Sequence, residues 1–216
     1  MKNLIITTVG EHHQAPSWLD GGGFDVFLID YTKDQLFKYP GIYREIVTRG
    51  MWDYDYYWLP DEDIHLCSDG INNLFQAMKD NELDLAQPSI LEAHDSFPSW
   101  DRFIHREGED IIPTDFVEVM CPVFSKMALS QCIETFTRSL SGWGLDLAWS
   151  KILQEKDMKM AIINNVIVKH TRQVGKGGLY AAIKKLGVLP SQERKRLMRE
   201  YGITEHSILN DNSTDS

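Results

Sequence analysis

Short apolar runs, each bounded by glycine or proline, predict strands in the first part of the chain. Residues 4–9 form one such run, which ends at Gly10, and residues 24–29 form another, which follows a triple glycine. The aromatic residues 54–59 form a third run and end at Pro60, which has no N–H to donate to a neighbouring strand. β-Branched and aromatic runs of this length are typical of buried strands.

Apolar residues at helical spacing predict helices between and after these strands. Residues 36–51 show this spacing, and the residues after Ser68, an expected N-cap, repeat apolar side chains at i, i+3, i+4 and i+7. The remaining predicted helices are one that Ser125 caps and Gly142 stops, one that begins near Leu145, and a charged one at about residues 192–201.

Further apolar runs at residues 83–87, 116–120 and 161–168 complete the predicted strands. Residues 89–114 have no sustained period and carry prolines and charges, so we interpret them as a long surface segment that borders the site. Because strands and helices alternate along the chain, we predict one compact α/β domain, a sheet with helices on its faces.

The composition excludes several classes of protein. A net charge of −10 repels the phosphates of long nucleic acids, which are therefore not expected partners. The three cysteines form no C-x-x-C pair, which argues against a disulfide framework or a cysteine-rich zinc site. No apolar run approaches the roughly 20 residues of a membrane span or resembles a signal peptide, so we expect a soluble, cytoplasmic protein.

Asp61 and Asp63 follow the third strand and are the first candidates for chemistry. Their carboxylates could converge on Mn²⁺ or Mg²⁺, whose charge would let an acidic protein bind a small anionic substrate. Ligands of open α/β sheets bind at the carboxyl ends of strands, which favours this interpretation over a solvated acidic turn. His170, just beyond residues 161–168, is a candidate third ligand, although single histidines are more often structural.

Residues 142–146, with the sequence GWGLD, place a carboxylate in the first turn of a helix with small residues before it. Asp146 is either a general base for an attacking hydroxyl or a residue that only complements the helix dipole. The glycine-rich stretch around Lys176 is either a phosphate-binding loop or a plain turn, because it lacks the spacing of a Walker A loop.

Four linked motifs make the interpretation more specific: YDYYWLPDED at residues 54–63, LAQPS at 85–89, FVEVMCPVFS at 116–125 and GWGLD at 142–146. In this order they resemble the DUF707 family, which is similar to glycosyltransferases of GT-A fold, over most of residues 1–175. The resemblance implies a GT-A-like, Rossmann-related mixed central sheet with helices on both faces. We accordingly expect a catalytic domain at residues 1–185, a C-terminal helical extension at 186–209 and a disordered polar tail at 210–216.

The same resemblance implies roles for individual residues. Asp61, Asp63 and His170 would hold Mn²⁺ or Mg²⁺ with a nucleotide diphosphate, and Asp146 would be the base. Related enzymes carry a glutamate-aspartate pair where this chain has Leu145 and Asp146, which leaves the stereochemical outcome open. The candidates for nucleotide binding are Thr8, Val9, Asp30, Glu62 and Lys176, and those for the sugar or acceptor are Trp143, Gly144, Gln87 and Glu118.

We therefore predict a metal-dependent hexosyltransferase that moves a sugar from a nucleotide-sugar donor, UDP-linked by similarity, to an acceptor hydroxyl. Exposed aromatics, including Trp18, Trp52 and Trp100, would form a carbohydrate platform. Two alternatives stay open: a non-catalytic nucleotide-sugar or carbohydrate-binding protein, and a metal-dependent phosphohydrolase that uses the same acidic turn. Replacement of Asp146 by Asn separates a transferase, which loses turnover and keeps binding, from a binding protein.

Overall fold

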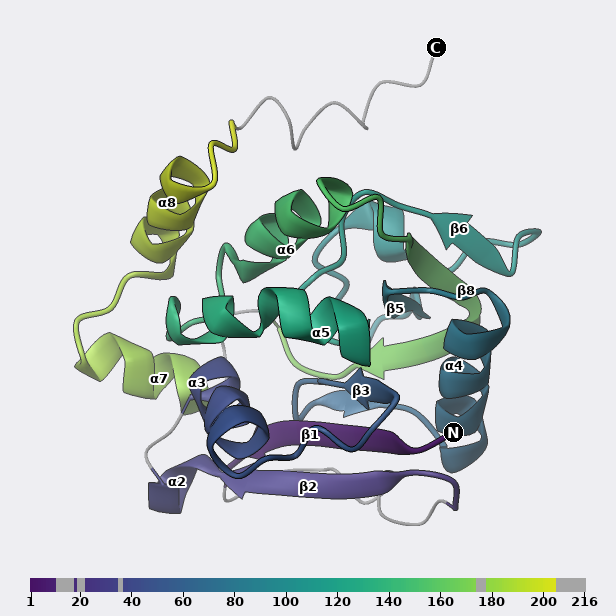
Figure 1. The fold of residues 1–216 in the computed structure, drawn as a ribbon, viewed down its shortest axis with the longest axis horizontal. Coiled ribbons are helices and arrows are strands. Elements are labelled where there is room, and N and C mark those ends of the chain that lie inside the picture. Colours follow the sequence, from purple (N-terminus) through teal and green to yellow (C-terminus); the bar gives the residue numbers. More distant parts are fainter. Residues whose placement is uncertain (11–17, 19–21, 35–36, 174–177, 205–216) are drawn as a thin grey trace.

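The predicted alternation of strands and helices is present in the structure, a computed structural model that describes residues 1–10, 18, 22–34, 37–173 and 178–204 (Figure 1). Up to residue 90 the elements are β1 (Asn3–Val9), β2 (Asp25–Asp30), α2 (Tyr31–Asp34), α3 (Lys38–Tyr43), a π-helical turn (Arg44–Thr48), β3 (Tyr56–Trp58), β4 (Ile64–His65), α4 (Ser68–Asp80) and β5 (Leu85–Ile90). Beyond it they are a 3₁₀ turn (Asp101–Phe103), β6 (Ile111–Pro113), β7 (Val123–Ser125), α5 (Lys126–Cys132), a second 3₁₀ turn (Ile133–Thr137), α6 (Leu145–Gln154), β8 (Met160–His170), α7 (Gly178–Lys185) and α8 (Pro190–Glu200).

The strands form one mixed sheet of eight strands in the order β2-β1-β3-β7-β5-β8-β4, with β6 also paired to β8. Strands β1, β2, β3, β5 and β8 run in one direction, and β4, β6 and β7 run against it. The carboxyl ends of the parallel strands therefore share one edge, on the side where α2, α7 and α8 lie in Figure 1. This is the edge at which open α/β sheets bind their ligands.

Alternate strand residues belong to two separate buried clusters, one on each face of the sheet. Ile5 and Trp58 pack with the apolar side of α4, whereas Ile6 and Tyr57 pack with α3, α5 and α6. Successive side chains of a strand point to opposite faces, so neighbouring residues enter different clusters. The structure thus confirms an α/β fold with a mixed central sheet between helices.

Trp149 of α6 is the centre of the cluster that α3, α5 and α6 share. Its ring lies 5.3 Å from that of Tyr39, 5.1 Å from that of Phe124 and 5.6 Å from that of Phe136. The indole Nε1 donates a hydrogen bond of 2.9 Å to Oγ1 of Thr135. Trp149 is fully buried, and its one polar atom has a hydrogen-bond partner. Its ring therefore packs β7 of the sheet against α3, α6 and the second 3₁₀ turn without leaving a buried donor unsatisfied.

The predicted strand at residues 116–120 is wrong, since this segment is irregular and the strand is β7, a few residues later. Its backbone groups form hydrogen bonds with side chains from other elements. The side chain of Gln87 accepts the N–H of Glu118 at 2.7 Å, and Nζ of Lys38 donates to the carbonyl of Val119 at 2.8 Å. Backbone groups that are bonded in this way are not available to a neighbouring strand.

Helix boundaries also differ from the prediction. The helix expected at residues 36–51 is divided into α3 and a π-helical turn, and α4 has Cys67, not Ser68, as its N-cap. Helix α5 is followed by a 3₁₀ turn and does not extend to Gly142. Ser125 is confirmed as its N-cap, because the hydroxyl accepts a first-turn N–H at 3.1 Å.

Residues 89–114 are less irregular than predicted, since they contain a 3₁₀ turn and β6, which extends the sheet beside β8. Helix α7 has no counterpart among the predicted elements. Trp18, expected to be exposed, is fully buried against Trp58, with 5.7 Å between ring centroids. The tail predicted at residues 210–216 lies outside the described residues.

Among the described residues, no helix is both long and apolar enough to cross a membrane. The three cysteines are free thiols, of which Cys121 and Cys132 are buried and Cys67 is exposed.

Candidate functional site

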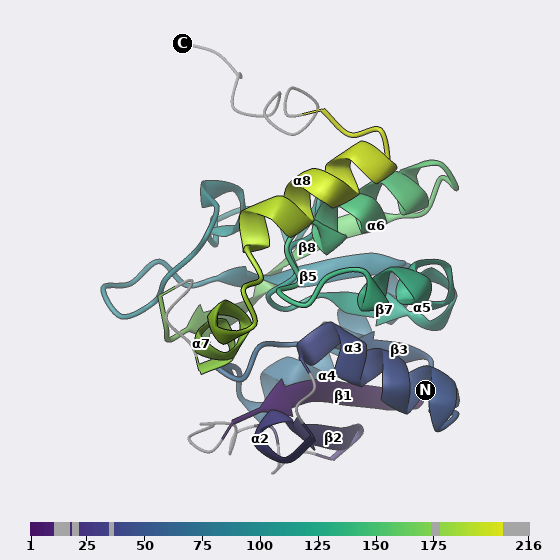
Figure 2. The ribbon, with the colours of Figure 1, turned by 90° about the vertical axis from the view of Figure 1, so that its left-hand side faces the viewer.

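A pocket of about 310 Å³ lies at the carboxyl edge of the sheet. Figure 2 views the molecule from this edge, with α2, α7 and α8 on the near side. The walls come from the ends of β1, β3 and β8, the irregular segment before β7, the loop before α6, and helices α3, α7 and α8. Segments that are distant in the sequence meet here because the parallel strands all end here.

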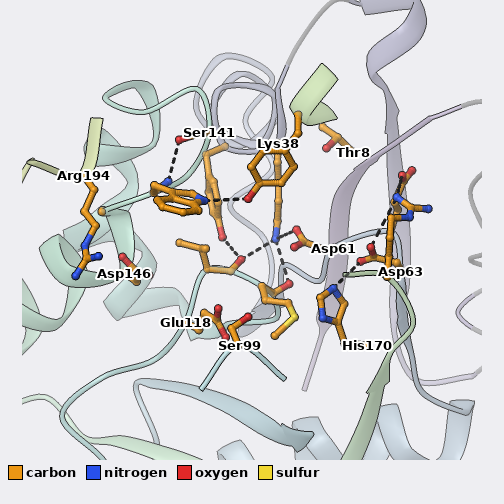
Figure 3. Close-up of a pocket in the computed structure, with 18 of the residues that line it drawn as sticks. Thr8, Lys38, Asp61, Asp63, Ser99, Glu118, Ser141, Asp146, His170 and Arg194 are labelled. Atoms are coloured by element: carbon orange, nitrogen blue, oxygen red, sulfur yellow. Dashed lines mark hydrogen bonds and ion pairs between the residues drawn. The ribbon is translucent and has the colours of Figure 1, made fainter. Parts of the chain in front are cut away.

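Asp63 and His170 meet at one end of the pocket because β4 pairs with the last residues of β8, which sets Ile64 opposite His170. Nε2 of His170 lies 3.5 Å from Oδ1 of Asp63, and Nδ1 donates to the carbonyl of Phe97 at 2.7 Å (Figure 3). Both side chains are buried. Within the described part of the chain, Oδ1 of Asp63 has no hydrogen-bond partner.

Asp61 is bound by Lys38, a residue that the sequence did not indicate. Lys38 is 5% exposed, and its Nζ donates to Oδ1 of Asp61 at 2.7 Å. The same ammonium donates to the carbonyls of Val119 and Met120, at 2.8 and 3.3 Å. All three of its protons are used in this way, so Lys38 fixes both Asp61 and the segment before β7.

Burial and neighbouring charges shift the pKa values of this group in different directions. Burial raises the pKa of Asp61, and the ammonium of Lys38 opposes that rise. Burial also acts to raise the pKa of Asp63, but the close contact with His170 and the charge of that imidazole outweigh it, and the pKa is lowered. The pKa of His170 is raised, since burial lowers it less than Asp63 raises it.

Glu62 connects the end of β1 to the residues after β8. One carboxylate oxygen accepts the N–H of Gly10 at 2.7 Å, and the other lies 2.9 Å from Arg172. Arg172 also lies 3.7 Å from Oδ2 of Asp63. Glu62 therefore borders the pocket with both of its oxygens bonded to protein groups.

Asp146 lies at the other end of the pocket, in the first turn of α6. Gly144 precedes this helix at φ +88°, a conformation that favours glycine. Oδ1 of Asp146 accepts the N–H of Leu147 at 2.9 Å. Burial raises the pKa of Asp146 to about 6, against the opposing charge of Arg194.

Trp143 also lines the pocket. Its Nε1 donates to the hydroxyl of Tyr180 at 2.9 Å, and its backbone N–H donates to Oγ of Ser141 at 3.2 Å (Figure 3). These bonds hold the indole in one orientation, as a flat wall that could bind an apolar face of a sugar ring.

Glu118 forms part of the pocket floor and is 7% exposed. Its backbone N–H is bound by Gln87, whereas its Oε2 has no hydrogen-bond partner among the described residues. Burial raises the pKa of Glu118 to about 8, although a hydrogen bond from Ser99 works against the rise. At neutral pH the carboxyl is therefore mostly protonated, a donor and not a negative charge.

We expect Glu118→Gln to change how stability depends on pH. In the wild type the folded state keeps a proton that the unfolded state releases above a pKa of 4.5, so stability falls as pH rises from there to about 8. The variant lacks this fall, and its stability relative to wild type should rise by a few kcal/mol between about pH 5 and about pH 9, since one pKa unit corresponds to about 1.4 kcal/mol. Urea unfolding at the two pH values measures this, and a stability difference independent of pH would contradict it.

The pocket unites most of the residues that the sequence predicted for the site. Four of these are the metal and base candidates Asp61, Asp63, His170 and Asp146, and five others also line it: Thr8, Glu62, Glu118, Trp143 and Gly144.

Three predicted binding residues do not line the pocket. Val9 is buried in β1, and Gln87 lies fully buried beneath the floor, where it supports Glu118. Asp30 is bonded to Thr32 and Lys33, whose contacts lower its pKa to about 2. Lys176 lies outside the described residues.

Six cationic or phenolic residues of the pocket were missed by the sequence analysis: Tyr31, Lys38, Tyr39, Arg172, Tyr180 and Arg194. Only Arg172 had a local signal, because it follows the predicted ligand His170 by two positions. The others reach the pocket from helices whose own sequence patterns carry no mark of it.

The fit of this site to a divalent cation rests on Asp63. Among the described residues, no three histidine, cysteine or acidic side chains are grouped closely enough to form a ready metal site. However, Oδ1 of Asp63 is buried without a hydrogen bond and faces Nε2 of His170, and carboxylate and imidazole donors suit Mn²⁺. The donor types therefore fit, with Asp63 and His170 as the nearest pair and Asp61 beside them.

The fold and the pocket together define an α/β protein with a pocket at the carboxyl edge of a mixed sheet, lined by carboxyl and cationic side chains as well as by apolar ones. Residues 101–214, more than half of the chain, match a family described as "Protein of unknown function (DUF707)". The chain belongs to the DUF707 family, as the sequence motifs predicted.

Comparisons with individual proteins give less information about the chain than the family match does. No curated protein matches the chain. Among solved structures, the chain is similar to "Crystal Structure of A197 from STIV", with 12% sequence identity and a TM-score of 0.48 over 79% of this chain and 85% of that chain.

Proposed function

We propose that the protein is a metal-dependent glycosyltransferase of GT-A-like fold, which moves a sugar from a nucleotide-sugar donor to an acceptor hydroxyl. The observation that carries the proposal is that one pocket contains both the Asp61, Asp63 and His170 group and the half-buried carboxylate of Asp146. A transferase of this kind needs a site for the diphosphate of the donor and, within the same pocket, a base for the acceptor.

Asp63 and His170, with Asp61 beside them, would hold Mn²⁺ or Mg²⁺ at the end of the pocket nearest β4 and β8. When bound, the ion would act as a Lewis acid that neutralises charge on the diphosphate leaving group. Lys38 keeps the carboxylate of Asp61 in place through a contact of 2.7 Å, and Arg172 adds positive charge at the same end. Because both cations are paired with carboxylates here, the bound ion would supply the positive charge that a nucleoside diphosphate needs at this end.

Asp146 would take the proton of the acceptor hydroxyl. Its pKa of about 6 lies just below neutral pH, so the carboxylate is mostly ionised and still basic enough to accept a proton. Glu118, with a pKa of about 8, stays protonated in the same pocket and can donate a hydrogen bond to a sugar oxygen. Two carboxyl groups with pKa values on opposite sides of neutrality match the division between base and donor in many enzymes.

The donor site is tested by thermal unfolding of the purified protein with Mn²⁺ and a panel of nucleoside diphosphates and nucleotide sugars. A ligand at about 100 times its Kd stabilises the folded state by about 2.7 kcal/mol, which raises the Tm of a chain of this size by about 5–10 °C. We expect such a shift with one nucleotide, UDP by similarity, and its loss in Asp63→Ala, which removes the buried oxygen that lacks a hydrogen bond.

The matched control is Asp53→Ala, which removes an exposed carboxylate from the loop before β3, at the opposite edge of the sheet. This variant should keep the full nucleotide shift. The absence of a shift with every nucleotide, or an equal shift in wild type and Asp63→Ala, would refute the donor site. A metal-dependent shift without turnover on any acceptor would favour a binding protein.

A further inference from the structure

We propose that Arg194 of α8 forms an anion-binding position at the Asp146 end of the pocket, and that the acceptor of the sugar therefore carries a phosphate or carboxylate group. The second half of this statement rests on the proposed function, whereas the anion-binding position does not.

Helix α8 is fixed to the pocket by Glu193, the neighbour of Arg194. The carboxylate of Glu193 accepts the backbone N–H groups of Leu140 and Ser141, both at 2.9 Å, and the hydroxyls of Ser139 and Ser141, at 3.0 and 2.6 Å. These bonds bind α8 to the loop that leads to α6. They also lower the pKa of Glu193, against the effect of burial, so the attachment holds at neutral pH.

Gly144 brings the backbone of α8 still closer. A Cβ atom at this position would lie 2.9 Å from Cα of Arg194 and 3.2 Å from the side chain of Leu197, which is fully buried. The absence of a side chain at Gly144 is thus what allows α8 to pack at this distance. The start of the Arg194 side chain is set by backbone packing, and its guanidinium lies beside the pocket and not free in solvent.

Arg194 differs from the other cations of the pocket in how its charge is used. The three protons of Lys38 are all bonded to protein oxygens, and Arg172 is paired with Glu62 and Asp63. By contrast, the guanidinium of Arg194 makes no hydrogen bond or salt bridge with the residues that the structure describes, and its charge acts on the nearby Asp146, where it opposes the rise in pKa that burial causes. Its five N–H donors are therefore available to a ligand.

The position of Arg194 separates its ligand from the donor diphosphate. Figure 3 shows Arg194 with Asp146 on one side of the pocket and Asp63 with His170 on the other, with Lys38 and Asp61 between them. An anion at Arg194 would therefore lie next to the proposed base and away from the proposed metal ligands. The planar fork of a guanidinium matches the paired oxygens of carboxylates and phosphates, and a hydrogen bond to a charged group is stronger than one between neutral groups.

The test compares three related sugars by titration calorimetry: glucose, glucuronate and glucose 6-phosphate, with inorganic phosphate as a fourth probe. In the wild type we expect at least one of the two anionic sugars to bind more tightly than glucose, by about 10- to 100-fold. Arg194→Gln should abolish this preference, while Arg199→Gln, the same change at an exposed position of the same helix, should keep it. The two anionic sugars distinguish a carboxylate from a phosphate ligand, and inorganic phosphate shows whether the anion alone is sufficient.

Equal affinity for all three sugars, no binding of any probe, or an unchanged preference in Arg194→Gln would overturn the proposal. Binding of UDP with Mn²⁺ is measured in the same variants, and it should be unaffected by Arg194→Gln. Weaker UDP binding in that variant would assign Arg194 to the donor and reject the acceptor site. If the wild type did not bind UDP but still preferred an anionic sugar, the proposed transferase would be rejected and the anion-binding position would be supported.

Discussion

Asp146→Asn is expected to lower turnover by about 10²- to 10⁴-fold, the range typical of a lost general base, with nucleotide binding unchanged. The substitution keeps the shape of the side chain, and the Asn oxygen can still accept the N–H of Leu147. The measurement is release of the nucleoside diphosphate from the donor in the presence of an acceptor. In the wild type the rate should also fall as pH decreases through about 6, where Asp146 takes up a proton, and this fall should be absent from the residual activity of the variant.

The matched control for Asp146→Asn is Asp53→Asn, which makes the same chemical change at an exposed position outside the pocket. Its turnover should equal that of the wild type. Full activity of Asp146→Asn would remove the base from the proposed mechanism and favour the interpretation that Asp146 only complements the dipole of α6.

Trp149→Ala is expected to destabilise the fold by about 3–5 kcal/mol, the cost typical of truncating a buried tryptophan. The variant loses ring contacts with Tyr39, Phe124 and Phe136, and it leaves the hydroxyl of Thr135 without the indole donor. Urea or guanidinium unfolding measures the difference in the free energy of unfolding.

Two further variants keep this prediction testable if Trp149→Ala does not fold. Trp149→Phe retains part of the ring volume and should lose less stability, and Trp52→Ala, at a partly exposed tryptophan, should lose least. Equal losses for Trp149→Ala and Trp52→Ala would contradict the central position that the packing gives to Trp149.

The sequence predicted best those elements in which local pattern and burial agree. Strand β1 and the first half of β8 are apolar runs because both of their faces are covered, whereas β2 is an apolar edge strand that is mostly only partly buried. Helices α4 and α6 keep a helical apolar period because each has one face on the sheet. The segment at residues 116–120 has a similar apolar pattern but serves as pocket wall. Its backbone is bonded by Lys38 and Gln87, and a single sequence carries no sign of such contacts.

In the site, too, the sequence predicted what local position determines and missed what tertiary contacts determine. Asp61, Asp63 and His170 were predicted to converge because they follow strands, and strand ends share an edge. That rule does not specify which way a side chain turns, so it also selected Val9 and Asp30, which lie at strand ends and outside the pocket. Lys38 and Arg194 come from α3 and α8, which are far apart in the sequence, and only tertiary packing brings them to the pocket.

The contacts that Trp143 and Glu193 make have a thermodynamic consequence for the loop at residues 139–144, which leads into α6. This loop is held by the hydroxyl of Tyr180 on α7 and by the carboxylate of Glu193 on α8, so its conformation depends on the last part of the chain. A ligand that binds between Asp146 and Arg194 would contact both sides of this attachment. Occupancy of the pocket and local opening of α8 are then linked equilibria, and whatever free energy the ligand gains from the closed arrangement is added to the free energy required to detach the helix.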